Sequence, residues 1–109
     1  MKYELLELKQ QLKEELTHNI LPFWMEKMTD DQNGGFYGQM TGKNKLVTDA
    51  PKGGILNARI LWTFSSAALH LKNPLYLKYA TRAKEYIFNY FFDSENGGTY
   101  WMLNADGTP

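Results

Sequence analysis

A glycine-rich motif occurs twice in this chain, 63 residues apart. The segment Asn33-Gly34-Gly35-Phe36-Tyr37 aligns with Asn96-Gly97-Gly98-Thr99-Tyr100, and Asp30 aligns with Asp93 in the same frame. Glycine supplies the positive φ angles that a tight reversal requires, and the aromatic or β-branched residues after it favour an extended segment. We therefore expect two short hairpin-like loops, each after a helix, with Asn104 to Gly107 as the tip of the second.

The segment before the first loop has the pattern of a helix with one apolar side. Its apolar residues recur every three or four positions, with lysine and glutamate between them: Leu5, Leu8, Leu12, Leu16 and Ile20. This period predicts a helix that packs on one side and faces solvent on the other. Because Pro22 cannot donate to the carbonyl four residues back, we expect a kink near Asn19 before the helix continues.

Two further helices are expected between the loops. Residues 54–71 have apolar side chains in all directions around a helical wheel, which is typical of a helix enclosed on all sides. The third helix begins at Asn73, which can act as an N-cap, and at Pro74, which suits the first helical position. Its apolar residues form one face, so we expect it to be half-exposed: Tyr76, Tyr79, Ala80, Ala83, Ile87, Tyr90 and Phe91.

The composition fits a single folded segment, residues 1–109, without an internal domain boundary. Apolar residues make up 43% and aromatic residues 15%, which is enough for a core. Twelve basic and twelve acidic side chains balance, so neither nucleic acid nor an anionic membrane surface is an expected partner. The absence of cysteine excludes disulfides and thiolate metal sites. No apolar run is long enough to cross a membrane, and we expect a cytoplasmic protein.

The order of these elements predicts an all-α fold. An outer helix, a loop, an enclosed helix, another outer helix and a second loop at the same level describe the opening of an α/α toroid, although a helical solenoid has the same order. Aromatic loops at one face of a closed ring can wall a sugar-binding cleft, because the apolar faces of pyranose rings stack on aromatic side chains. The loop composition therefore favours the toroid.

Three segments of the chain resemble one enzyme family. They are NILPFWMEKMTDDQNGGFYG from Asn19, DAPKGGILNARILWTFSSAAL from Asp49 and ENGGTYWMLNADGTP from Glu95. Together they are similar to the amino-terminal part of the N-acylglucosamine 2-epimerase superfamily, and most like its cellobiose 2-epimerases. The most specific element runs from Lys52 to Ser65.

The resemblance implies an (α/α)6 barrel, of which this chain covers about the first three helices and two glycine-rich loops. It implies an isomerase that inverts C2 of a reducing-end sugar, cellobiose becoming glucosyl-mannose, by proton abstraction and return through an enediol-like intermediate. Neither a cofactor nor a metal is implied. In the family's pattern the two histidines that act as acid and base lie beyond Pro109. We therefore expect no catalytic residue here and no activity from this chain alone.

Arg59 is the residue to which the resemblance assigns contact with the sugar. It is also the only formal charge from Gly53 to Leu71, and a buried guanidinium without a partner is strongly unfavourable. The structural alternative is an ion pair with Asp49 or Asp31.

Three aromatic residues are further candidates for substrate binding. Tyr37, Tyr100 and Trp101 follow the two glycine turns and could wall a sugar cleft. Aromatic residues in such positions more often anchor the loop to the core, which is the alternative for all three.

Two alternative functions remain open. Within the same superfamily the substrate could be a monosaccharide or an N-acyl sugar, as for mannose isomerases and N-acylglucosamine 2-epimerases. Alternatively, the chain is a non-catalytic helical module that associates with copies of itself to cover the flanks of its middle helix.

Overall fold

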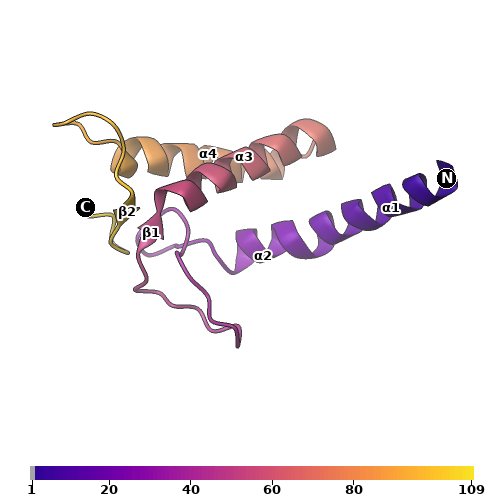
Figure 1. The fold of residues 1–109 in the computed structure, drawn as a ribbon, viewed down its shortest axis with the longest axis horizontal. Helices are drawn as coiled ribbons and strands as arrows, with labels where there is room; N and C mark the ends of the chain where they lie inside the picture. The colour runs from indigo at the N-terminus through magenta and orange to yellow at the C-terminus, as the bar shows by residue number, and fades with distance from the viewer. Residues whose placement is uncertain (1) are drawn as a thin grey trace.

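The computed structural model describes residues 2–109 and shows three helical segments joined by two loops (Figure 1). The first segment consists of α1 (Lys2–Glu15), the π-helical turn η1 (Leu16–Ile20) and α2 (Leu21–Glu26). The second is α3 (Gly54–Leu71), and the third is α4 (Pro74–Tyr86) with the π-helical turn η2 (Ile87–Phe91). Two short strands are β1 (Lys52–Gly53) and β2 (Met102–Leu103). The predicted order of three helices and two glycine-rich loops is confirmed.

The irregularity expected near Asn19 is present as the π-helical turn η1. The N–H of Leu21 donates to the carbonyl of Leu16, five residues back. Pro22 follows in the first turn of α2 and has no N–H to donate. The wider turn therefore carries the helix past the missing hydrogen bond.

The predicted packing of the first helix is wrong for α1 within this chain. α1 has no buried residue, and its apolar stripe stays open, with Leu5 59% and Leu12 62% exposed. The reason is visible in Figure 1, where α1 extends away from α3 and α4. Only the end of the segment reaches the core, where Leu21 is fully buried and Leu16 and Trp24 pack around it.

The main core lies between α3 and α4, which run side by side as an antiparallel pair (Figure 1). As predicted, Asn73 caps α4, its Oδ1 accepting the N–H of Leu75 at 3.0 Å, and Pro74 occupies the first turn. The Phe64 ring of α3 stacks on Phe36 of the first loop, with 6.3 Å between ring centroids. The core thus joins both helices to the first glycine loop.

The prediction that α3 is enclosed on all sides is not met by residues 2–109. One side of the helix is buried: Asn57, Ile60, Phe64 and Ala67. The opposite side keeps large apolar side chains exposed: Ile55 at 50%, Trp62 at 71% and Leu69 at 72%. Their spacing of seven residues places them on one strip along the helix. α4 and the first loop cover the buried side, whereas the strip remains at least half exposed within residues 2–109.

The two glycine loops share the same backbone hydrogen bonds. In the first loop, Asp30 donates to the Gly35 carbonyl and Gly34 donates to the Asp30 carbonyl, both at 3.0 Å. In the second, the bonds Asp93 to Gly98 and Gly97 to Asp93 measure 3.0 and 2.9 Å. Both glycines of each loop have positive φ. The sequence repeat is therefore a repeat of structure.

The repeat continues through the tips of the loops. The turn predicted at Asn104 to Gly107 is confirmed, with Gly107 at φ 92° donating to the Asn104 carbonyl. The first loop has the equivalent turn 63 residues earlier, where Asn44 at φ 61° donates to the Thr41 carbonyl. Sequence comparison did not reveal this second match, because the residue types at the two tips differ.

Both loops lie at the same end of the helices, where β1 pairs with β2 (Figure 1). Lys52 is opposite Leu103 in this antiparallel pair, and the Gly54 N–H donates to the Trp101 carbonyl at 2.9 Å. The chain is thus mostly helical, as predicted, with a small strand pair that the sequence analysis did not predict. A closed ring is not seen in residues 2–109.

Candidate functional site

The burial expected for Arg59 is not found in residues 2–109: the residue lies in the second turn of α3 with an exposed side chain. It lines a hollow of about 210 Å³ between α2 and α3, whose other residues are Trp24, Leu56, Ile60, Thr63 and Phe64. Neither Asp49 nor Asp31 pairs with it, and within residues 2–109 Arg59 has no ion-pair partner. The guanidinium therefore stands free beside an apolar wall.

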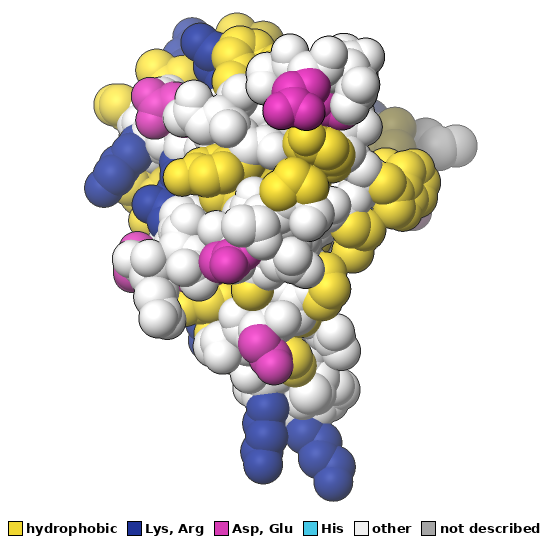
Figure 2. Space-filling model, turned by 90° about the vertical axis from the view of Figure 1, so that its left-hand side faces the viewer, with side chains coloured by type: hydrophobic (Ala, Val, Ile, Leu, Met, Phe, Trp, Pro, Cys, Tyr) yellow, Lys and Arg dark blue, Asp and Glu magenta, His cyan; other side chains and the backbone are white. Residues whose placement is uncertain are grey.

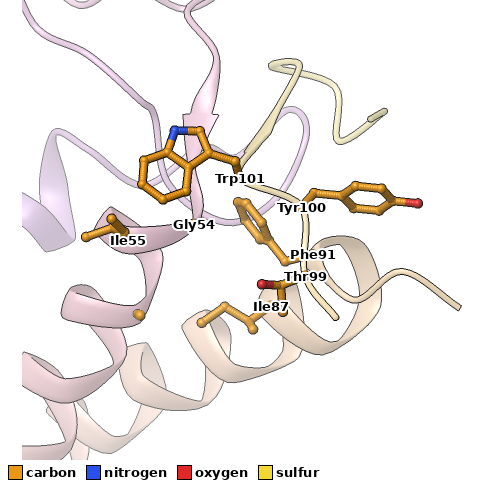
Figure 3. Close-up of a pocket in the computed structure, with 8 residues that line it drawn as sticks. Gly54, Ile55, Ile87, Phe91, Thr99, Tyr100 and Trp101 are labelled. Atoms are coloured by element: carbon orange, nitrogen blue, oxygen red, sulfur yellow. The ribbon is translucent and has the colours of Figure 1, made fainter. Parts of the chain in front are cut away.

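A second hollow of about 330 Å³ adjoins the beginning of α3, and it is walled by the second loop and η2 (Figure 3). Its lining residues are Gly54, Ile55, Ala58, Ile87, Phe91, Thr99, Tyr100 and Trp101. The Trp101 side chain is 73% exposed, and Figure 3 shows its indole above Gly54 and Ile55. Since Ile55 and Arg59 are one turn apart, the two hollows flank the same end of α3.

Of the two candidate tyrosines, Tyr37 and Tyr100, only Tyr100 lines one of these two hollows. Figure 3 shows the Tyr100 ring directed away from Ile55 and Trp101. Partial burial, together with the nearby Asp93 carboxylate, raises the pKa of Tyr100. Tyr37 is half-buried beside Asp30 and lines neither hollow. The structure therefore brings Arg59 and Trp101 to one region but leaves Tyr37 apart.

The loop end of the molecule exposes apolar side chains among acidic, basic and neutral ones (Figure 2). Trp101, Phe92 and Met102 are among the large apolar residues exposed in the second loop. Apolar surface with a few polar groups is the composition typical of small-molecule binding sites.

A buried polar cluster under the first loop was not predicted from the sequence. The Lys52 ammonium lies 2.8 Å from Asp30 Oδ2 and 2.7 Å from the Gly34 carbonyl, and 4.9 Å from the centre of the Tyr86 ring. Arg82 of α4 donates to the Gly35 carbonyl through Nε at 3.0 Å, and to the Asp30 carbonyl through Nη2 at 2.6 Å. The sequence offered a partial signal, since Asp30 has a counterpart in the repeat, but nothing marked Lys52 as its partner.

Asp30 is held as a carboxylate. Burial works to raise its pKa, but hydrogen bonds from Lys52 and from the backbone N–H groups of Asn33 and Gln32 outweigh burial and keep the pKa below the usual carboxyl range. The charges of Asp30 and Lys52 neutralise each other inside the protein. This arrangement is structural, because both side chains are within 1% of complete burial.

Two buried polar atoms near this cluster have no hydrogen-bond partner among residues 2–109. They are the Tyr86 hydroxyl oxygen and Asn57 Oδ1. Burial, followed by the nearby groups Tyr90, Asp30 and Asp106, raises the pKa of Tyr86 to about 12. Asn57 donates from Nδ2 to the Gly53 carbonyl at 2.8 Å, so this side chain joins α3 to β1.

The two histidines do not form a site together. His18 is in η1 and His70 is in the last turn of α3, and both are exposed. Across residues 2–109, no three His, Cys, Asp or Glu side chains come together as a metal site would require. The described helices include none that is both long and apolar enough to cross a membrane.

Comparison with known proteins gives a consistent result. No family model matches the chain. The chain is 55% identical over 102 residues to a cellobiose 2-epimerase of Bacteroides fragilis, and the aligned region covers 94% of this chain and 26% of that protein. Its structure is similar to that of cellobiose 2-epimerase from Bacillus thermoamylovorans, with a TM-score of 0.88 and 42% identity over 92% of this chain and 26% of that one.

A second solved structure agrees. Cellobiose 2-epimerase from Spirochaeta thermophila matches with a TM-score of 0.89 and 39% identity, covering 97% of this chain and 26% of that one. The chain therefore spans about a quarter of the length of the relatives it matches.

Proposed function

We propose that the protein containing this chain is a carbohydrate 2-epimerase acting on cellobiose. The premise is that the chain is homologous to the cellobiose 2-epimerases. The observation that carries the proposal is the 55% identity over 102 residues. The match covers 94% of the chain and so includes the segment from Lys52 to Ser65, which contains Arg59.

We propose that residues 1–109 form part of one (α/α)6-barrel domain, with α3 as an inner helix. The exposed strip of Ile55, Trp62 and Leu69 supports this assignment, because exposed residues of this size normally mark a surface that another element covers. The solenoid alternative requires a similar cover, so the strip supports both architectures, and the homology favours the barrel.

The reaction we propose breaks the C2–H bond of the open-chain reducing-end sugar. A base takes the proton, the electron pair moves toward the C1 carbonyl to give an enediol-like intermediate, and a proton returns to C2 from the opposite face. Imidazole suits both roles, since it titrates near neutral pH. We assign both roles to histidines outside residues 1–109, and neither His18 nor His70 to either role.

Arg59 is the residue of this chain that we assign to the substrate. Its guanidinium is exposed and free of ion pairs among the described residues, so it is available to hydrogen-bond sugar oxygens and to stabilise negative charge as the carbonyl is enolised. Trp101, and less directly Tyr100, would offer apolar surface to a pyranose ring beside the same end of α3. Tyr37 lines neither hollow, and we assign it an accessory role at most.

The test is activity of the longer protein on cellobiose. We expect a glucosyl-mannose product by NMR, and Arg59→Ala lowers turnover by about 10²-fold or more, as loss of a group that stabilises the transition state does. Ser65→Ala is the matched control, because Ser65 is also exposed on α3. Normal turnover in Arg59→Ala would overturn the assignment of Arg59, and no epimerised product from cellobiose would overturn the proposed function. A panel with mannose and N-acetylglucosamine separates the alternatives in the superfamily.

For the 109-residue chain alone we propose self-association without activity. The apolar stripe of α1 and the strip of α3 are both exposed, and a second copy could cover them. Sedimentation velocity would then show species larger than 12.6 kDa. A monomer at high concentration would contradict this part.

A further inference from the structure

The two glycine loops have the same backbone but different surroundings. In the first, Asp30 Oδ2 and the Gly34 carbonyl share the Lys52 ammonium, at 2.8 and 2.7 Å. The equivalent groups of the second loop are Asp93 Oδ2 and the Gly97 carbonyl, 63 residues later. Within residues 2–109, neither of these two groups meets a cation, and no hydrogen bond reaches the Gly97 carbonyl.

Neutral groups take the place of the ammonium at Asp93. Asp93 Oδ2 accepts from Asn96 Nδ2 of the same loop at 3.2 Å, and Tyr100 lies near enough for the carboxylate to raise its pKa. Asp93 Oδ1 accepts the N–H groups of Glu95 and Asn96, both at 3.0 Å, as Asp30 Oδ1 does in the first loop. The aspartate is thus oriented like Asp30, but its charge is not neutralised.

The second loop is also uncovered. A Cβ placed on Gly35 would lie 2.7 Å from the Tyr86 ring, whereas nothing lies within 4 Å of one placed on Gly97 or Gly98. The first loop is covered by α4, the outer helix of the next repeat, whose Arg82 and Tyr86 contact the loop. The open face of the second loop therefore has the form of the first loop without Lys52 and α4.

We propose that the second glycine loop, residues 93–98, is a binding site for a lysine ammonium group, held between Asp93 Oδ2 and the Gly97 carbonyl. The occupant is the equivalent of Lys52 in a further repeat of the longer protein, which the 63-residue spacing places six residues beyond Pro109. Its binding fixes the start of the next inner helix, as Lys52 lies two residues before the first residue of α3. The inference rests on the internal repeat and on the proposal that this chain is part of a longer barrel protein, but it does not depend on the proposed reaction.

Low pKa at Asp93 agrees with this site. The hydrogen bond from the Asn96 N–H, with those from the Glu95 N–H and the Asn96 side chain, outweighs the effect of partial burial and lowers the pKa of Asp93. The carboxylate is therefore ionised at neutral pH and available to a cation, and a charge-assisted hydrogen bond to an ammonium is stronger than one to an amide.

The first test uses the chain as it is, with n-butylammonium chloride as a probe for the lysine side chain. Backbone NMR resonances of Asn96 to Gly98 are expected to shift saturably, while those of Asn33 to Gly35 do not, because Lys52 already fills the first loop. Tetramethylammonium chloride, which has the same charge but no N–H donor, is expected to leave both loops unchanged. Asp93→Asn is expected to remove the response.

Absence of a saturable shift, or equal shifts with tetramethylammonium, would overturn the proposal. Shifts of the second loop on dilution of the protein alone that are absent in Asp93→Asn would identify a cation of a second copy as the occupant, and would overturn the assigned source.

The second test supplies the proposed segment. A copy of residues 47–71 is added after Pro109, which places a second copy of Lys52 at the proposed position. Replacing that lysine by Met and making Asp93→Asn, singly and together, should show a coupling of tenfold or more in the unfolding equilibrium constant. Independent effects of the two changes would overturn the pairing. If the extended chain does not fold, the ammonium titration decides.

Discussion

Lys52 Nζ lies 2.8 Å from Asp30 Oδ2, with the two side chains 1% and 0% exposed. The pair joins the first glycine loop to the start of α3, so the segment that carries Arg59 begins at an ion pair inside the protein. The cost of desolvation offsets most of the attraction in a buried ion pair, so the pair adds little net stability. Removing one partner is strongly destabilising, because it leaves an isolated charge buried. The relationship is therefore best tested by breaking it.

Lys52→Met should destabilise the chain by about 3 to 5 kcal/mol, because it leaves the Asp30 carboxylate buried without its cation. The double variant with Asp30→Asn should lose less than the sum of the two single changes, since the uncompensated charge is then gone. Urea unfolding followed by circular dichroism measures both. Additive losses would contradict a direct interaction.

Acid should weaken the fold through Asp30. Its pKa is lowered in the folded chain and is about 4 when unfolded, so the unfolded chain binds more protons between these two values. The contribution of Asp30 is present above about pH 4 and is lost as pH falls through the folded pKa. The stability difference between the native chain and Asp30→Asn should therefore shrink below pH 4 in urea unfolding. A difference that stays constant down to pH 2 would refute this linkage.

Gly35→Ala and Gly98→Ala form a matched pair in the two loops. Both positions have positive φ, 65° and 73°, so each substitution should cost about 1 kcal/mol in backbone strain. Gly35→Ala should cost about 1 to 3 kcal/mol more, because the added Cβ meets the base of the Tyr86 ring. Equal losses of stability in the two variants would show that the first loop is not packed on Tyr86 as described.

The sequence predicted the local structure well because its signals are local. The bounds 54–71, the cap at Asn73 and the glycine turns all depend on residues within a few positions of one another. The environment of α3 was predicted less well, because apolar residues around a helix indicate that a cover is needed but not whether this chain supplies it. Lys52 was not predicted as a buried residue because its partner Asp30 is 22 residues away in the sequence. A lysine before two glycines resembles a solvated loop residue.

Tyr86→Phe should leave stability at pH 7 unchanged or raise it by up to about 1 kcal/mol, because the variant removes a buried hydroxyl that has no partner in residues 2–109. At high pH the free energy of unfolding of the variant should rise relative to that of the native chain. The pKa of Tyr86 is raised to about 12 in the folded chain and is about 10 when unfolded, so the unfolded chain loses this proton first and the stability of the native chain falls as pH rises from about 10 toward 12. Chemical unfolding at pH 7 and pH 11 measures the change, with Tyr3→Phe as the control at a residue that is 86% exposed. If Tyr86→Phe and Tyr3→Phe respond alike at pH 11, Tyr86 ionises freely and is not buried against the first loop.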